Sequence, residues 1–247
     1  MIHAYYMNLN GDCSYEQSLA LYNLLPEERR KRIRNMQNKD AARRGLYAGA
    51  FLQIVLGREL GIPANIVSYN YGKQGKPQLD VKRMEERLCG KKPEGWYSPL
   101  HFNLTHSGEY AALAVSDQVV GIDIEYKKKN ALKIAKRFFC PEEYEIILAA
   151  GDVKAQEQLF LEYWTMKEAY VKYSGKGLEL PLSSFLIRKE KVNGLSRVQG
   201  TEIWFSTFFL EGENYCVSIC SGDKNELEKI ATSICKIKQK QLFTGTL

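Results

Sequence analysis

The chain carries a short alternating segment, Gly121-Ile122-Asp123-Ile124-Glu125, which predicts a β-strand. Because successive side chains of a strand point to opposite faces, Asp123 and Glu125 share one face and the two isoleucines the other. A surface strand with outward polar residues is one interpretation of this pattern. The apolar residues before it indicate a strand buried on at least one face, where two unpaired carboxylates are costly. We therefore expect a cation between the two acids, and Gly121 would let a ligand or another backbone approach closely.

A second segment, residues 164–172 (WTMKEAYVK), predicts a helix. Its Trp164, Glu168 and Lys172 are spaced i, i+4, i+8 and therefore lie on one face. A helical Glu–Lys ion pair worth about 0.2–0.5 kcal/mol is one interpretation. Trp164 favours another, because tryptophan usually faces the core and so places its charged neighbours at the edge of a buried seam. A third carboxylate and an ammonium would then meet the first pair, and such a set suits a hard cation that holds a phosphate.

The composition allows a sizeable core and shows an uneven distribution of basic residues. The chain has 247 residues, 45% of them hydrophobic, which permits one large domain or two small ones. The formal net charge is +6, and basic residues crowd residues 28–34, 43–44 and 127–129. Such runs are either solvated helix faces or surfaces for anionic partners, here a phosphorylated cofactor, an acidic protein or nucleic acid.

The cysteines and the first residues of the chain indicate the cellular compartment in which the protein is expected. The 6 cysteines are scattered, with no C-x-x-C pair and no histidine nearby at zinc spacing, so we expect reduced thiols in a cytoplasmic protein. The first residues show no basic stretch followed by an apolar one, so we do not expect secretion. No apolar run approaches the roughly 20 residues that span a bilayer.

Hydrophobic periodicity, helix caps and turn residues predict a mixed succession of elements. Strands are expected at residues 2–9, 66–71, 101–105, 110–116, 119–126, 185–189, 201–209 and 214–220. Helices are expected at residues 14–24, from 26 onward, at 40–60, 132–139, 141–150 and 152–174, and at about 224–236. Residues 72–77 predict a flexible turn with two lysines, and residues 83–99 a surface loop that is helical in part.

The order of elements is similar in the two halves of the chain. A long helix, a strand, a loop and a strand pair occur in residues 40–116 and again in 152–220, without a residue-level repeat. We therefore expect an α+β fold with a pseudo-two-fold arrangement of two similar α/β halves, residues 1–117 and 118–247. The two motifs would face each other across the junction of the halves, and clefts at such junctions commonly bind ligands.

Two further segments have a polar pattern. Residues 103–108 (NLTHSG) predict either a strand that ends in a polar turn or an anion site with a hydroxyl, an imidazole and exposed backbone N–H groups. A Ser–His hydrolase has little support, because no G-x-S-x-G is present and the other histidines are His3 and His101. Residues 72–77 are not a P-loop, because they lack the pattern G-x-x-x-x-G-K-[ST] and no apolar helix follows them. Their lysines could still close over a nucleotide.

Taken in order, residues 101–108, 121–125 and 164–172 resemble the 4′-phosphopantetheinyl transferases. The resemblance is to the surfactin-synthetase-activating type, the large single-chain form, and covers about residues 1–220. Residues 134–139, 175–178 and 75–77 also fit this family. The resemblance implies the family's fold and its reaction. In that reaction the 4′-phosphopantetheine arm of coenzyme A moves to a serine of an apo peptidyl or acyl carrier protein, with Mg²⁺, and adenosine 3′,5′-bisphosphate is released.

The resemblance also implies a set of site residues. Asp123, Glu125 and Glu168 would bind Mg²⁺ at the coenzyme A pyrophosphate. Glu168, or a metal-associated water, would deprotonate the carrier serine, and Lys172 would neutralise charge on the phosphate under attack, so the catalytic set is Glu168, Lys172 and Asp123. The implied coenzyme A contacts are Thr105, His106 and Lys172 at the phosphates, Lys31 and Arg44 at the 3′-phosphate, and Gly75 and Lys76 along the adenine. This chain has Thr105, Arg44 and Glu28 where the family representative has Ser, Thr and Lys.

Two other classes of function remain open from the residues alone. One is a Mg²⁺-dependent phosphodiesterase or nuclease that uses the same carboxylates. The other is a non-catalytic basic binding protein, which is disfavoured because plain binding needs no metal triad. For the transferase we expect a monomer with no nucleic-acid or membrane partner, and carriers of nonribosomal peptide and antibiotic biosynthesis, since this is the large form. The basic residues 26–34 and 132–137 would steer an acidic carrier.

Overall fold

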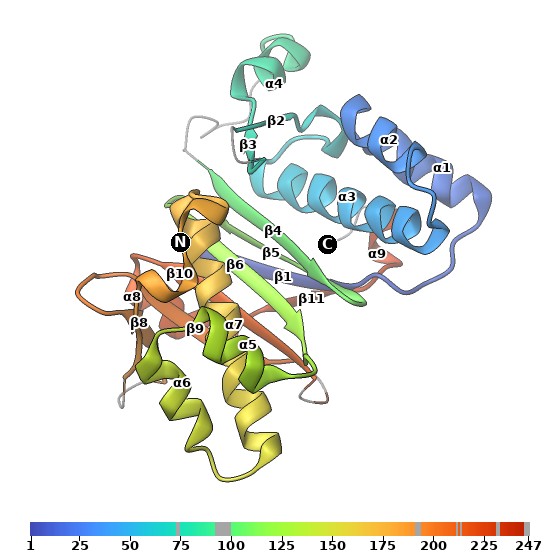
Figure 1. Cartoon of the computed structure of the whole chain (residues 1–247). Coiled ribbons are helices and arrows are strands. Elements are labelled where there is room, and N and C mark those ends of the chain that lie inside the picture. The colour runs from blue at the N-terminus through green and yellow to red at the C-terminus, as the bar shows by residue number, and fades with distance from the viewer. Residues whose placement is uncertain are drawn as a thin grey trace.

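The computed structural model describes residues 1–72, 75–91, 100–190, 194–210, 212, 214–230 and 233–244. Helices and sheets mix in both halves of the chain, as the α+β prediction requires. Most of the first half lies at the upper right of Figure 1 and most of the second half at the lower left. In the described part of the chain, none of the helices has the length and apolar character needed to cross a membrane.

The first half begins with a strand, continues with three helices and ends with an antiparallel strand pair. Its elements are β1 (Ile2–Asn8), α1 (Tyr15–Leu24), α2 (Glu27–Arg34), α3 (Lys39–Leu60), the 3₁₀ turn η1 (Ala64–Ile66), β2 (Tyr69–Tyr71), β3 (Pro77–Leu79), α4 (Val81–Leu88), β4 (His101–Ser107) and β5 (Tyr110–Ser116). Ser14 caps α1 through the amide of Gln17, and Gly61 ends α3 in the left-handed conformation with φ of 65°.

The second half repeats this order and then returns to the first sheet. Its elements are β6 (Val120–Tyr126), α5 (Ala131–Phe138), α6 (Pro141–Leu148), α7 (Val153–Ser174), the 3₁₀ turns η2 (Gly177–Glu179) and η3 (Leu182–Ser184), β7 (Ile187–Lys189), β8 (Ser196–Val198), β9 (Trp204–Phe209), β10 (Tyr215–Ser221), α8 (Lys224–Ile230), β11 (Cys235–Ile237) and α9 (Gln241–Thr244).

The strand order shows the internal similarity of the halves. The first sheet has the order β11-β1-β5-β4, and the second has the order β6-β10-β9-β8-β7, while β2 and β3 form a separate pair. In each half the last strand of the repeated unit, β5 or β10, lies antiparallel between that half's first strand and its penultimate one. This is the expected pseudo-two-fold arrangement. The division of the chain at residue 117 stays a prediction; the late strand β11 lies on the first sheet, parallel to β1.

Several short elements differ from the predicted ones. The helix predicted at about 224–236 is wrong at its C-terminal end, because residues 235–237 instead form β11 along β1. The strand predicted at 66–71 begins only at Tyr69, after η1. Part of the predicted loop 83–99 is the helix α4, which the Asp80 side chain caps at the Arg83 amide. Residues 92–99 of that loop lie outside the described residues.

Gly121 sets the distance between β6 and α7. A Cβ at this position would lie 2.1 Å from the Ala169 carbonyl oxygen and 2.8 Å from the Tyr173 nitrogen, both on α7. The close approach expected of Gly121 is therefore that of another backbone. Ile122 and Ile124 are fully buried in a cluster on the other face of β6. The face that carries Asp123 is consequently the one that α7 covers.

Candidate active site

The two halves meet where β4 lies beside β6 (Figure 1). Side chains of β4 accept hydrogen bonds from the backbone of β6. The Asn103 Oδ1 atom accepts a hydrogen bond of 3.1 Å from the Ile122 amide, and the Ser107 hydroxyl oxygen accepts one of 3.2 Å from the Tyr126 amide. Both strands are edges of their own sheets. Polar side chains at alternate positions of β4 therefore face the acids of β6.

Asp123 is the centre of a cluster from three elements. Lys172, in the last turn of α7, places its Nζ 2.5 Å from Asp123 Oδ1 and 2.8 Å from Thr105 Oγ1. The Thr105 hydroxyl of β4 also donates to Asp123 Oδ1, at 3.0 Å. Asp123 is only 3% exposed. The structure thus brings together one residue from each of the three sequence motifs.

Glu125 is held by two residues that the sequence analysis did not assign to the site. The Ser107 hydroxyl donates to Glu125 Oε2 at 2.7 Å, and Lys128 Nζ lies 3.0 Å from Glu125 Oε1. The same ammonium lies 4.2 Å from the centre of the Trp164 ring, a cation–π contact. The signal for Ser107 was its two-residue spacing from Thr105, which places both hydroxyls on one face of a strand.

The remaining acid, Glu168, lies on α7 one turn before Lys172. Burial raises its pKa, and the negative charge of Asp123 raises it further, against the opposing effect of Lys172. Burial also raises the pKa of Asp123, although Lys172 acts in the opposite direction. Within the described residues, the buried Oδ2 atom of Asp123 has no hydrogen-bond partner. An added cation would stabilise the ionised form of both acids.

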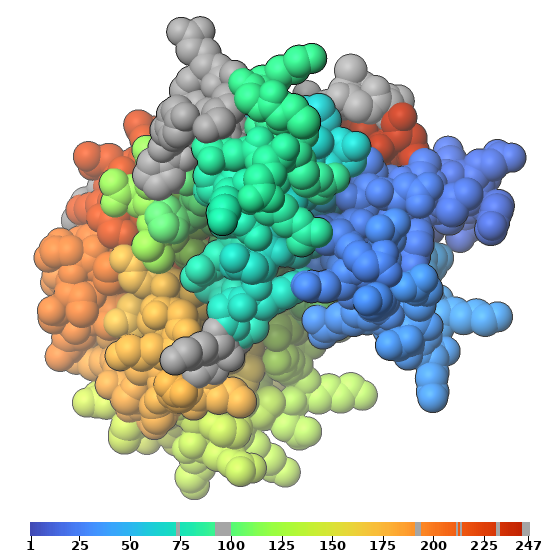
Figure 2. Space-filling view, turned by 90° about the horizontal axis from the view of Figure 1, so that it is seen from above, coloured from blue at the N-terminus to red at the C-terminus, as the bar shows by residue number. Residues whose placement is uncertain are grey.

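A basic cavity of about 360 Å³ opens beside this cluster, bounded by α2, α3, β4 and the turn after β2. It is lined by Arg29, Arg32, Ile33, Met36, Gly45, Tyr71, Gly75, Pro77, Leu104, Thr105, His106 and Lys172. Figure 2 shows the teal segments of β2, β3 and α4 between the blue helices of the first half and the orange segments of the second. Two guanidinium groups and an ammonium suit an anionic ligand that ends at the carboxylates.

The chain matches two family models over adjoining regions. Residues 119–220 match the 4′-phosphopantetheinyl transferase superfamily, and residues 12–118 match the N-terminal region of 4′-phosphopantetheinyl transferases. A 4′-phosphopantetheinyl transferase of Bacillus subtilis is 31% identical over 78% of this chain and 80% of its own length. The chain belongs to the 4′-phosphopantetheinyl transferase superfamily.

Two further relatives match this chain over comparable or smaller fractions of its length. The 4′-phosphopantetheinyl transferase gsp of Aneurinibacillus migulanus is 31% identical over 81% of this chain and 76% of its own length. HetI of Nostoc sp. is 37% identical over 55% of this chain and 54% of its own length. The chain is thus a transferase of the 4′-phosphopantetheine group, with a carrier protein as acceptor and coenzyme A as the donor. The alternatives of a nuclease or a non-catalytic binding protein receive no support from these matches.

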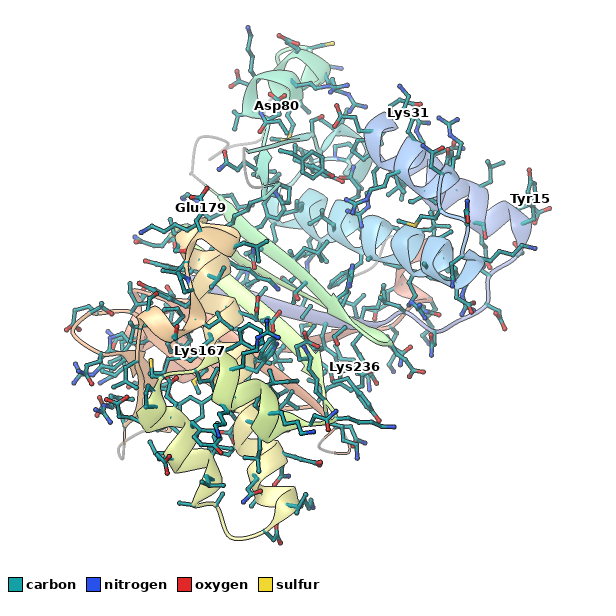
Figure 3. The ribbon with its side chains drawn as sticks, viewed as in Figure 1. Tyr15, Lys31, Asp80, Lys167, Glu179 and Lys236 are labelled. Carbon is teal, nitrogen blue, oxygen red and sulfur yellow. The ribbon has the colours of Figure 1, made fainter. Side chains whose placement is uncertain are left out.

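The transferase's predicted coenzyme A residues do not all lie at the cavity. Gly75, Thr105, His106 and Lys172 line it, as do Arg29 and Arg32, which the resemblance did not indicate. Lys31 lies on α2 (Figure 3) with an exposed side chain, and Arg44 is partly buried in α3; neither lines the cavity. Lys76 is directed elsewhere, since its Nζ donates to the Lys172 carbonyl oxygen at 2.6 Å.

The predicted Mg²⁺ ligands fit a hard cation by their chemistry rather than by their present spacing. Among the residues that the structure describes, no three His, Cys, Asp or Glu side chains form a group that could hold a metal ion. Lys172 occupies one oxygen of Asp123, and Ser107 and Lys128 hold Glu125. The unpartnered Oδ2 of Asp123 and the desolvated carboxyl of Glu168 are nevertheless oxygen donors of the kind Mg²⁺ prefers.

Proposed function

We propose that this transferase moves 4′-phosphopantetheine from coenzyme A to a serine of an apo peptidyl or acyl carrier protein in a Mg²⁺-dependent reaction that releases adenosine 3′,5′-bisphosphate. The observation that carries the proposal is the position of Lys172. This side chain contacts Asp123 and also lines the basic cavity. A pyrophosphate that extends from the cavity would therefore meet the ammonium and the carboxylates together.

Phosphoryl transfer depends on positioning and charge stabilisation more than on covalent help from the protein. Lys172 lies where it would neutralise charge on the phosphate under attack. Asp123, Glu125 and Glu168 are the residues that would hold Mg²⁺, which supplies further neutralisation of the pyrophosphate when bound. Ser107 and Thr105 orient two of these carboxylates through hydrogen bonds of 2.7 and 3.0 Å.

The carrier serine needs a base, because a hydroxyl is a weak nucleophile near neutral pH. Glu168 is the proposed base. Burial and the neighbouring Asp123 raise its pKa, which brings a carboxylate closer to the range in which a general base works best. A water bound to the metal is the other group that the resemblance implies for this role.

Arg29, Arg32 and His106 line the cavity and are proposed to hold coenzyme A phosphates, with Gly75 along the adenine. Lys31 of α2 and Arg44 of α3 stay proposed 3′-phosphate contacts, although neither lines the cavity. On this proposal residues 1–117 bind the nucleotide end of coenzyme A, and residues 118–247 supply the metal ligands and the catalytic helix.

The acceptor is proposed to be an acidic carrier protein. Basic residues gather in α2 and in α5, so they would steer such a partner toward the junction of the halves. The large single-chain form favours carriers of nonribosomal peptide and antibiotic biosynthesis. We propose a cytoplasmic monomer without a nucleic-acid or membrane partner, since one chain holds both halves of the site.

The test is mass spectrometry of apo carrier proteins incubated with coenzyme A, Mg²⁺ and this enzyme. The proposal expects a gain of one phosphopantetheine on the carrier, and loss of that gain when EDTA replaces Mg²⁺. An unmodified mass across several peptidyl and acyl carriers would contradict the proposed acceptor. Labelling that persists in EDTA would contradict the proposed metal.

A further inference from the structure

Lys76 spans the junction of the two halves. It belongs to the turn between β2 and β3, and its Nζ donates a hydrogen bond of 2.6 Å to the carbonyl oxygen of Lys172 in the last turn of α7. Its neighbours Gly75 and Pro77 line the basic cavity. Lys76 itself lines a second hollow of about 540 Å³, together with residues at the end of α7 such as Tyr173.

The carbonyl that Lys76 contacts lies in the last turn of α7, where carbonyl groups lack partners within the helix. This end of a helix also carries the negative pole of the helix dipole, which favours a cation. The end of α7 is only partly closed by its own residues, since the Gly175 amide and the Ser174 hydroxyl both donate to the Val171 carbonyl. An ammonium at the Lys172 carbonyl therefore supplies a missing donor.

The Lys76 ammonium is partly removed from water and therefore needs a hydrogen-bond acceptor in the protein. Desolvation lowers the pKa of Lys76, whereas the charge of the buried Cys220 group acts to raise it. An ammonium in such a position is stable only with a well-placed acceptor. Among the described residues, the acceptor that the structure provides is the main chain of Lys172. Lys76 is not among the residues that line the basic cavity.

Lys172 thus has partners at both its side-chain ammonium and its main-chain carbonyl. Asp123 and Thr105 fix its ammonium, and Lys76 fixes its main chain. We propose that Lys76 is a positioning residue, which docks the nucleotide-bordering turn of the first half onto the end of α7 and so sets where Lys172 lies. The inference rests on the proposed role of Lys172 at the transferred phosphate. The resemblance implied that Lys76 lies along the adenine. We instead assign its side chain a structural role, as a link between the basic cavity and α7.

The experiment compares Lys76→Met and Lys76→Arg with the wild-type enzyme and with Lys82→Met, which removes an exposed lysine of α4 nearby. Steady-state labelling of an apo carrier gives kcat and KM for coenzyme A. Calorimetry gives the Kd of coenzyme A for the same variants. Amide hydrogen exchange over residues 171–175 reports the end of α7 without any need for turnover.

For Lys76→Met we expect kcat to fall about tenfold, as for loss of one charged hydrogen bond. We expect the Kd of coenzyme A to change less than about threefold, and exchange at residues 171–175 to become faster. Lys76→Arg should restore most of kcat, and Lys82→Met should match the wild type. A tenfold weaker Kd with unchanged kcat would overturn the proposal and make Lys76 a nucleotide ligand.

Unchanged kcat and unchanged exchange in Lys76→Met would also overturn it. Failure of the proposed function has a different signature, because the wild-type enzyme would then label no carrier at all. In that case the exchange measurement still decides the contact, since it depends on the link between Lys76 and α7 and not on the reaction.

Discussion

Replacing Lys167 by methionine should destabilise the second half of the enzyme strongly. Lys167 of α7 and Glu143 of α6 are both 0% exposed and form an ion pair of 2.8 Å. The Lys167 ammonium also donates to the Leu182 and Phe185 carbonyl oxygens, at 2.7 and 2.8 Å. The Glu143 carboxylate accepts from the Ile187 amide at 2.8 Å. The pair therefore ties α6, α7 and the segment around η3 together.

The magnitude follows from what the substitution leaves behind. Methionine fills much of the volume but leaves the Glu143 carboxylate buried without its counter-charge. Removing one partner of a buried pair costs about 3–5 kcal/mol. For a protein of this size each kcal/mol lowers Tm by about 2–4 °C, so the expected drop is about 6–20 °C.

Urea and thermal unfolding, followed by circular dichroism, measure this effect. Lys133→Met, which removes an exposed lysine of α5, is the matched control and should unfold like the wild type. The double variant Lys167→Met/Glu143→Gln removes both charges and keeps an oxygen for the Ile187 amide. It should regain at least about 1 kcal/mol relative to Lys167→Met, because a buried neutral amide costs less than a buried carboxylate without its counter-charge. A loss below about 1 kcal/mol in Lys167→Met would refute the reasoning.

Three further predictions concern β6, its neighbour β4 and α7. Gly121→Ala should lower stability by about 1–3 kcal/mol and reduce labelling, because its Cβ would lie 2.1 Å from the Ala169 carbonyl oxygen; unfolding and activity assays test this. Ser107→Ala should raise the Mg²⁺ concentration needed for half-maximal labelling, since Glu125 loses its 2.7 Å hydrogen bond, whereas Ser107→Thr should not. Burial raises the pKa of Tyr163 to about 12, above its ordinary value of 10.0, so the unfolded chain loses this proton first and stability should fall as pH rises from 10 to 12. The urea midpoint of Tyr163→Phe should fall less over that range.

The long elements were predictable because their signals are local. The strands β1, β5 and β6 carry continuous apolar or alternating patterns, and α3 and α7 are long enough for caps and periodicity to mark both ends. Short strands carry no such signal. β11 exists because β1 offers it a partner, with Tyr5 opposite Cys235, so its pairing depends on a residue far away in the chain.

The sequence predicts which face of a single strand or helix a site residue occupies, because strand alternation and helical spacing are local patterns. Asp123, Glu168 and Lys172 could be placed on faces from the sequence, and their meeting was implied by the resemblance. The contact of Lys76 with the end of α7 could not be foreseen, because it joins residues 96 positions apart in two halves. Arg29 and Arg32 were missed since a run of basic residues does not show which of them face a cavity.

The most direct test of the active site compares Glu168→Gln with Glu157→Gln on the same helix. Glu157 lies about three helical turns before Glu168 and lines a separate small hollow with Lys127 and Lys154. The measurement is kcat/KM for transfer of labelled phosphopantetheine to an apo carrier protein. The account predicts at least about a hundredfold loss for Glu168→Gln, as expected when a general base is removed, and less than about a twofold change for Glu157→Gln. Wild-type kcat/KM in Glu168→Gln would contradict it.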